Sequence, residues 1–309
     1  MEKKLRLLGD VLGEYYRVNE EYLFYCPYCR HHKRKFSINV SKGVYKCWVC
    51  DVNGRNLRRI VRRFGTFYQR KEWEELDGRV DLNIFDKIFE EEPEEEQQII
   101  KLPKEFTSLA NKGLPLAALP ALNYLGRRKI FSDDILRWKI GYCASGEYAG
   151  RVLVPSFNED GHVNYFVARS YDNNWKKYKN PPASRDIIFN DLYVDWTSDL
   201  SIVEGVFDAI VAGGNSIPLL GSSLRVDSNL FQKIVKNDTP IYVALDPDAE
   251  KKALNLIKNL LTYGVELYKV DITPFSDVGE MTKEEYRKRK DEALPMTEDS
   301  YLLYQAMNL

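Results

Sequence analysis

The 309-residue sequence contains no apolar run close to the roughly 20 residues that are needed to cross a bilayer. Its first ten residues, MEKKLRLLGD, have no long apolar core and no small-residue cleavage site, so we expect no signal peptide. A GxxxxGKS or GxxxxGKT loop is also missing, which argues against a Walker-type ATPase and an ATP-driven helicase domain. These absences favour a cytoplasmic protein with no membrane partner.

The chain also lacks a large net charge, because 45 Lys and Arg nearly balance 46 Asp and Glu. The charges are distributed unevenly: residues 1–65 hold 15 basic and 6 acidic residues, whereas residues 66–105 hold 6 basic and 13 acidic residues. A basic region at one end of a nearly neutral body indicates that a polyanion binds there. The length and the 44% of hydrophobic residues predict two or three domains with a sizeable core.

Cysteine is scarce, but four of the five cysteines form two CxxC pairs. Cys26 and Cys29 are separated from Cys47 and Cys50 by seventeen residues. Two such pairs can direct four thiolates at one point, which is typical of a closed tetrahedral zinc site. Free buried thiols or a redox pair are the alternatives, and His31 or His32 could replace a cysteine as ligand. KFSINV and GVYKCW read as strands, so this region is predicted to be a zinc ribbon.

Basic and aromatic residues alternate around these cysteines. They are Arg30, Lys33, Arg34, Lys35, Lys42 and Lys46, interleaved with Tyr28, Phe36, Tyr45 and Trp48. Basic side chains follow phosphates and aromatic faces stack on bases, so the mixture suits single-stranded nucleic acid. The alternative is that the aromatic residues form the small core of the ribbon.

A short basic helix with leucines at helical spacing is expected before the ribbon, and NLRRIVRRF reads as an amphipathic helix after it. The charge then inverts, since six of the seven residues from Glu90 to Glu96 are acidic. Such a run is most often a solvated linker. It could also act as an acidic tether that nucleic acid displaces.

An α/β region is expected between Lys104 and Asp199, with helices near 115–127 and 132–138. RVLVPSFNEDGHVNYFVARSYD alternates apolar and polar residues on both sides of an EDG turn, which predicts a β-hairpin. The following KKYKN would by itself be read as a solvated loop. Isolated Cys143 is predicted to be a small core residue.

Four short apolar runs alternate with amphipathic segments between Ser201 and Glu280, in βαβαβαβ order. This order predicts a parallel sheet whose active edge lies at the carboxyl ends of its strands. Glu204, Asp246, Asp248 and Asp277 follow those strands. A single acid in such a place is usually a helix cap, but several of them would repel one another without a cation. Magnesium or manganese, which take oxygen ligands, fit such a cluster.

The motifs VEGVFDAI, GSSL, ALDPDAE and SDVGEM resemble the TOPRIM module of bacterial and phage replicative primases, topoisomerases and some nucleases. On that resemblance Glu204 matches the first glutamate, Asp208 the acid one turn later, and Asp246 and Asp248 the DxD pair. Asp277 and Glu280 match the last acidic motif in its phage form. Gly279 stands where the bacterial version carries a second aspartate.

The two regions before this module extend the resemblance to primases. The four-cysteine ribbon resembles the zinc-binding domain of replicative primases in its phage version, where it helps to read the template. RVLVP, VARS, KKYKNPPAS and IFNDLY resemble the basic subdomain that precedes TOPRIM in these enzymes, with PPAS in place of a serine-led motif. Arg151, Arg169, Lys177, Tyr178 and Asn180 fall on its motif positions. This likeness favours a site over a solvated loop for KKYKN, with Lys177 as a catalytic residue and the other four as substrate-binding residues.

The resemblance covers about 250 residues and implies a DNA primase closest to the phage enzymes. It would start short RNA chains on single-stranded DNA from ribonucleoside triphosphates, with a separate helicase acting in trans. The predicted parts are a zinc-binding domain at 1–65, an acidic linker at 66–105, a basic subdomain at 106–199, a TOPRIM subdomain at 200–280 and a helical segment at 281–309. The alternatives are a TOPRIM nuclease and a non-catalytic zinc-ribbon protein that binds single-stranded DNA.

Overall fold

The computed structural model describes residues 1–77, 100–172, 175–221 and 224–307, without the side chains of residues 77, 248, 250 and 307. The chain divides into two compact units. The first unit comprises the described part of residues 1–96 together with 235–237 and 262–264, and the second comprises the other described residues. The acidic run from Glu90 to Glu96 lies outside the described residues.

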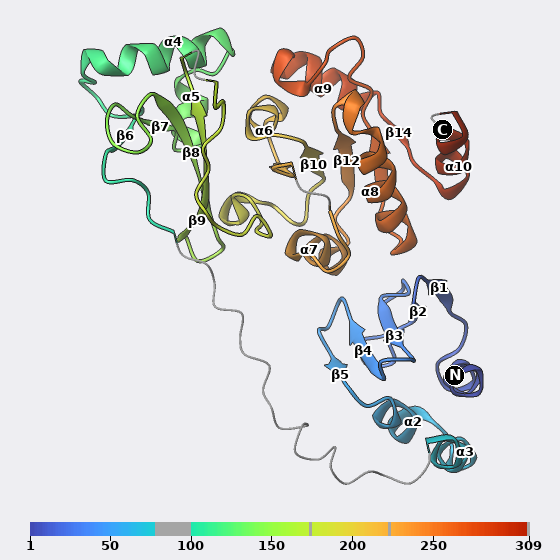
Figure 1. Ribbon diagram of the computed structural model, residues 1–309. Helices are drawn as coiled ribbons and strands as arrows, with labels where there is room; N and C mark the ends of the chain where they lie inside the picture. The colour runs from blue at the N-terminus through green and yellow to red at the C-terminus, as the bar shows by residue number, and fades with distance from the viewer. Residues whose placement is uncertain (78–99, 173–174, 222–223, 308–309) are drawn as a thin grey trace. The chain divides into compact units, whose positions relative to one another are not determined.

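The first unit contains a five-stranded antiparallel sheet whose strands pair in chain order (Figure 1). They are β1 (Tyr16–Val18), β2 (Glu21–Phe24), β3 (Phe36–Asn39), β4 (Val44–Cys47) and β5 (Asn53–Gly54). Its helices are α1 (Glu2–Leu12), α2 (Arg58–Phe64) and α3 (Phe67–Asp77). Leu8 of α1 and Phe36 of β3 share a buried core with Trp73 of α3. The predicted helices and ribbon strands are confirmed, and α3 adds a helix within the range where we expected the linker.

The second unit begins with a four-stranded antiparallel sheet in the order β6-β7-β8-β9. Its elements are β6 (Phe106–Ser108), η3 (Leu116–Ala118), α4 (Leu119–Arg127), α5 (Ser132–Arg137), β7 (Gly141–Cys143), β8 (Arg151–Phe157), β9 (Val163–Ser170) and η4 (Asp191–Tyr193). β8 and β9 form the predicted hairpin, with a register shift at Ser156 and Phe157. Cys143 is fully buried among Leu153, Phe166 and Ala168, as expected for a core residue.

A second sheet follows in the order β11-β10-β12-β13-β14. Its elements are β10 (Leu200–Val203), α6 (Val206–Ala212), β11 (Ser216–Pro218), α7 (Asn229–Asn237), β12 (Ile241–Ala244), η5 (Pro247–Ala249), α8 (Glu250–Thr262), β13 (Leu267–Lys269), η6 (Val278–Glu280), α9 (Lys283–Asp291), β14 (Leu294–Pro295) and α10 (Glu298–Met307). The first four strands are parallel, which confirms the expected sheet.

The order of these strands creates a topological switch point. β10 pairs with β11 on one side and with β12 on the other. The connection after β10 therefore runs toward one edge of the sheet, and the later strands are added toward the other edge. In open parallel sheets, ligands bind beyond the carboxyl ends of the strands at such a point. The sequence did not predict β14, which is antiparallel and carries Pro295 at the edge of the sheet, where a missing N–H is tolerated.

Within the described ranges, no helix combines the length and the apolar character that crossing a membrane requires.

Candidate functional site: a four-cysteine cluster and an acidic sheet edge

The four paired cysteines converge in the first unit. Their sulfur atoms all lie within 4.8 Å of one another, with 3.8 Å between Cys26 and Cys50 and 3.8 Å between Cys29 and Cys47. Four sulfurs at about 2.3 Å from one tetrahedral ion would lie about 3.8 Å apart, so the cluster fits a zinc-sized ion. The close Cys26 sulfur and burial raise the pKa of the Cys47 thiol, so a bound cation would be needed to hold that sulfur as a thiolate.

Residues around the cluster bear on two alternatives from the sequence: histidine as a zinc ligand, and aromatic residues as the core of the ribbon. The rings of His31 and His32 lie against each other, tilted by 32° with 4.4 Å between their centroids, and neither residue is a member of the cluster. Phe36 and Tyr45 are buried in the core of the first unit, so for these two aromatic residues the core alternative holds. Arg34 lies over the ring of Tyr25, 4.6 Å from its centroid.

The acids of the second unit leave neighbouring strands at the switch point. Val203 at the end of β10 pairs with Ala244 at the end of β12, so Glu204 and Asp246 emerge at the same edge. Glu204 Oε1 lies 3.1 Å from Lys252 Nζ. Glu204 Oε2 is buried without a hydrogen-bond partner among the described residues. A buried carboxylate oxygen with no donor is a ligand atom that a metal ion would satisfy.

Asp208 connects two segments that are far apart in the chain. Its Oδ2 accepts a hydrogen bond of 2.8 Å from Gly205 N, and its Oδ1 accepts one of 2.9 Å from Gly279 N. A Cβ at residue 279 would lie 2.9 Å from Asp208 Oδ1 and 3.1 Å from Asp277 Oδ1. Glycine therefore fits between these two carboxylates, which gives a physical reason for its place in the acidic motif.

Burial, followed by repulsion from Asp277, raises the pKa of Asp208 to about 6. The two backbone hydrogen bonds and Arg128 act in the opposite direction without cancelling the effect. A divalent cation near Asp208 would favour the ionised form that burial and Asp277 disfavour. Among the side chains that the structure describes, however, only the four cysteines make a cluster of three or more metal-binding groups.

The raised pKa of Asp208 gives a testable prediction. The unfolded carboxyl ionises near its ordinary value of 3.8 and the folded one near 6. Protonated Asp208 therefore stabilises the fold below about pH 4, and this contribution is lost as the pH rises through about 6. In urea titrations without divalent ions, the unfolding free energy of the wild type relative to Asp208→Asn should fall by about 1–3 kcal/mol between these pH values. A difference that does not change with pH would contradict the assignment.

Arg128, which directly follows α4, is a member of this site that the sequence reasoning missed. Its Nε donates a 2.8 Å hydrogen bond to the hydroxyl of Tyr124, and its guanidinium lies 4.8 Å from the ring centroid of Phe207. The positive charge of Arg128 acts to lower the pKa of Asp208. Because Arg128 sits at the end of an expected helix with no motif around it, only its place in the fold reveals it.

The remaining predicted acids are placed less completely. Asp248 lies in η5, and its side chain is outside the described residues. Glu280 is exposed and accepts a hydrogen bond of 3.0 Å from Ser276 N. Asp277 precedes η6 and is close enough to Asp208 to raise its pKa.

The predicted basic residues lie on and beside β8 and β9. Arg151 is 5% exposed, and its guanidinium donates to the backbone carbonyls of Lys176 and Lys177 at 2.8 and 3.2 Å. Arg151 therefore holds the KKYKN loop in place through the carbonyls of that loop. Asn180 Oδ1 accepts a 3.2 Å hydrogen bond from Ala168 N of β9, which ties the end of the loop to the same sheet.

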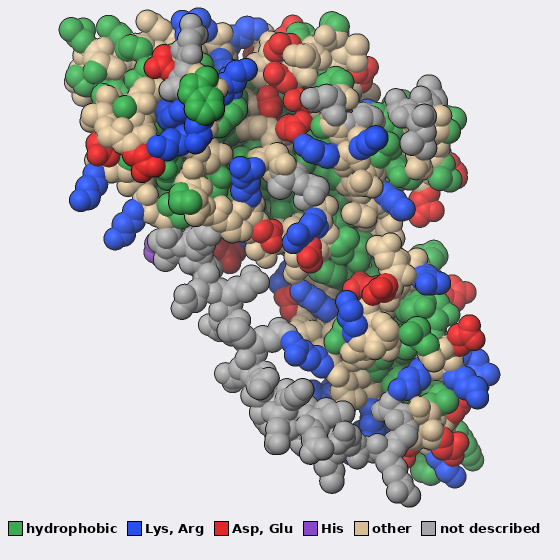
Figure 2. Space-filling view, in the orientation of Figure 1, with side chains coloured by type: hydrophobic (Ala, Val, Ile, Leu, Met, Phe, Trp, Pro, Cys, Tyr) green, Lys and Arg blue, Asp and Glu red, His purple; other side chains and the backbone are tan. Residues whose placement is uncertain are grey.

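Arg169 and Tyr178 form a stacked pair across this loop. The guanidinium of Arg169 lies 4.5 Å from the ring centroid of Tyr178, and the two residues form an isolated antiparallel bridge. Burial raises the pKa of the Tyr178 hydroxyl, and the charge of Asp208 adds to the effect. Lys177 between them is exposed. Figure 2 shows Lys and Arg side chains gathered over β8 and β9, and a row of Asp and Glu side chains over α6 and α9.

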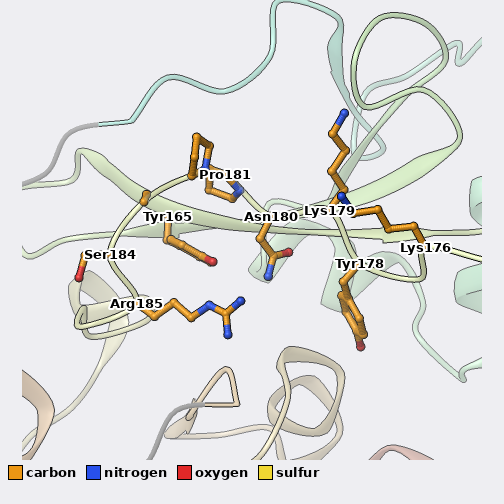
Figure 3. A pocket seen from close by; sticks show the side chains of 10 residues that line it. Tyr165, Lys176, Tyr178, Lys179, Asn180, Pro181, Ser184 and Arg185 are labelled. Atoms are coloured by element: carbon orange, nitrogen blue, oxygen red, sulfur yellow. The ribbon is translucent and has the colours of Figure 1, made fainter.

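A pocket of about 650 Å³ opens beside the loop. Figure 3 shows Tyr165, Asn180 and Arg185 directed toward the same space, whereas Lys179 points away from it. Lys179 instead lies 3.1 Å from Glu147. Arg185 was not predicted; its Nη1 donates to the carbonyl of Leu220 at 3.4 Å, and this links the pocket to the segment after β11.

Comparisons with known proteins agree with this arrangement. A DNA primase of Thermotoga maritima is 23% identical over 327 residues, which cover 89% of this chain and 57% of that protein. A DNA primase of Helicobacter pylori is 22% identical over a match that covers 86% of this chain and 56% of that protein. The chain thus spans just over half the length of these curated relatives. No family model matches the chain.

Among solved structures, the DnaG primase catalytic domain bound to single-stranded DNA matches 63% of this chain and 77% of its own, with a TM-score of 0.53 and 19% identity. The relatives named here are bacterial, and the expected closeness to the phage version stays a prediction. Similarity in sequence to bacterial primases, and in fold to a primase catalytic domain, relates this chain to the bacterial type of DNA primase.

Proposed function

We propose that this protein is a DNA primase, which synthesises short RNA primers on single-stranded DNA during replication. The observation that supports the proposal is that Glu204 and Asp246 follow β10 and β12, two neighbouring parallel strands at the switch point of the sheet. Tyr178 of the basic KKYKN loop lies near enough to Asp208 for the charge of Asp208 to raise the pKa of the Tyr178 hydroxyl. Nucleotidyl transfer needs this combination, because a triphosphate must be neutralised from two sides.

We propose the following roles for residues of the chain. Glu204, Asp246, Asp248 and Asp277 would hold magnesium or manganese, and the bound ion would make the primer 3′ hydroxyl more acidic and neutralise the triphosphate. Asp208 holds the loop at Gly279 in place. Arg169 and Lys177 would bind phosphates, and Tyr178 and Asn180 would line the place of the nucleotide. Arg151 serves them as a positioning residue, because it is bonded to the loop carbonyls.

The four-cysteine cluster would hold one structural zinc ion. The ribbon around it would contact the single-stranded template, with basic side chains on phosphates and exposed aromatic residues on bases. Ribonucleoside triphosphates are the proposed substrates. A separate replicative helicase is the proposed partner, and the cytoplasm is the proposed place of action.

The proposal is tested by incubating the zinc-loaded protein with single-stranded DNA of varied sequence, the four ribonucleotides and magnesium. We expect short products that alkali degrades and that do not form when the template or the ribonucleotides are omitted. Shortened template without new RNA would indicate a TOPRIM nuclease instead. DNA binding with neither reaction would indicate a non-catalytic zinc-ribbon protein.

A further inference from the structure

We propose that Trp175 of the second unit stacks on a base of a single DNA strand that binds along the KKYKN loop. Trp175 directly precedes Lys176 and Lys177 of that loop. The residue is 91% exposed, more than any other large hydrophobic residue that the structure describes. None of the metal, phosphate and nucleotide contacts proposed above uses this side chain.

The exposed indole of Trp175 is suited to contact a flat ligand from outside the chain. The ring has a large apolar area, and covering that area with another apolar surface is favourable. Tryptophan is also rigid, so a ligand that covers it costs little side-chain entropy. For these reasons tryptophan is enriched among the residues that contribute most to binding.

The loop backbone next to Trp175 is held by the antiparallel sheet of the second unit. The Arg151 guanidinium donates to the carbonyl of Lys176 at 2.8 Å and to that of Lys177 at 3.2 Å. Ser170 N donates to the same Lys177 carbonyl at 2.9 Å. The residue that follows Trp175 is thus bonded to β8 through Arg151. Such preorganisation reduces the entropy that is lost when a ligand binds.

The charge around Trp175 favours a nucleic acid as the ligand. Lys176 and Lys177 are exposed, and Figure 2 shows Lys and Arg side chains gathered over β8 and β9. Asp172 is the nearest acid in the chain, and its carboxylate accepts a hydrogen bond from the hydroxyl of Ser170. Lysines attract phosphates and an aromatic ring stacks on any base, so this combination is typical of sites that bind single strands.

A DNA strand fits this position better than a free nucleotide does. The pocket of about 650 Å³ is lined by Lys176 and Tyr178 but not by Trp175. Small-molecule sites bury roughly 70–90% of their ligand, whereas an indole outside the pocket offers an open surface. A strand can bind there because its neighbouring phosphates and bases add contacts along that surface. The inference rests on the proposed function for the identity of the strand, which is the primase template.

Fluorine NMR of the labelled indole tests the contact directly. The full-length, zinc-loaded protein would be labelled with fluorotryptophan, and the signal of Trp175 would be assigned by its loss in Trp175→Phe. A 12-nucleotide oligothymidylate, an abasic strand of the same length and ATP would be titrated separately, without magnesium. We expect a saturable shift of the Trp175 signal with the oligothymidylate. The abasic strand should give less than about one-fifth of that shift, because phosphates alone offer no ring for stacking.

Substitutions of exposed aromatic residues measure how much the contact contributes to binding. Trp175→Ala should weaken the binding of labelled oligothymidylate by about fivefold or more, and Trp175→Phe, which keeps an aromatic face, should recover most of the affinity. Phe131→Ala is the matched control. Phe131 is 62% exposed in the same unit but is followed closely by Asp133 and Asp134, so its replacement should change the affinity by less than about twofold.

Three results would overturn the proposal. They are a Trp175 signal that does not shift with the oligothymidylate, an equal shift with the abasic strand, and equal affinities of Trp175→Ala and Phe131→Ala for DNA. A shift with ATP but not with DNA would assign the indole to a nucleotide instead and would also overturn it. Because none of these measurements requires RNA synthesis, failure of the primase proposal would leave the result unchanged.

Discussion

Asp246→Ala is expected to abolish the synthesis of RNA on single-stranded DNA. Asp246 leaves the switch point beside Glu204, and removal of its carboxylate would take away a ligand of the proposed divalent ion. Loss of one preorganised charge in a phosphoryl-transfer site typically lowers the rate by at least about 10²–10³-fold. Template binding should change by less than about twofold, because it rests on basic and aromatic side chains. Sized products and a fluorescence anisotropy titration measure the two quantities.

Asp160→Ala is the control for this variant. Asp160 lies exposed in the turn between β8 and β9 and belongs to neither the acidic edge nor the basic loop. Its replacement should leave synthesis unchanged. Full synthesis by Asp246→Ala would refute the assignment of Asp246 as a metal ligand. Equal loss of DNA binding and synthesis would show that the substitution had disturbed the fold instead.

Cys47→Ser is expected to release the zinc ion and to unfold most of the ribbon. Among the described side chains the cluster contains four sulfurs and no fifth metal-binding group, and a structural zinc site of this kind supplies about 10–16 kcal/mol of apparent binding free energy. Primer initiation on template should then be lost, whereas the second unit keeps its own core and could still extend a supplied primer. Zinc content by mass spectrometry and synthesis with and without a primer measure these effects.

Cys143→Ala is the matched control for this variant. Cys143 is the one cysteine outside the CxxC pairs and is buried in the second unit. Its variant should retain one zinc ion per chain and the ability to initiate. Initiation by a zinc-free Cys47→Ser protein would show that the ribbon does not read the template.

Local pattern was sufficient for much of this fold. The spacing of the cysteines predicted their cluster, because each CxxC turn is a short-range structure. Alternating residues around the EDG turn predicted the β8–β9 hairpin, and apolar runs separated by amphipathic segments predicted the parallel sheet. The placement of Glu204 and Asp246 at one edge followed from that sheet, since parallel strands end on the same side.

Other features required contacts between distant parts of the chain. The sequence suggested that Arg151 touches substrate, which stays a prediction, and only the structure shows that Arg151 is buried and donates to the carbonyls of the KKYKN loop. Asp208 matched a catalytic position, yet both of its oxygens accept hydrogen bonds from backbone N–H groups, one of them 71 residues away. The domain boundaries and the roles of the site residues stay predictions.

The sequence by itself determined which residues could bind metal and where many of the strands and helices lie, because turn spacing and side-chain periodicity act over a few residues. Only the tertiary structure decided that Arg128 lies over the ring of Phe207 and that its charge acts on Asp208. Those arrangements depend on burial and on long-range packing, in which a side chain's environment is set by residues that no local pattern connects to it.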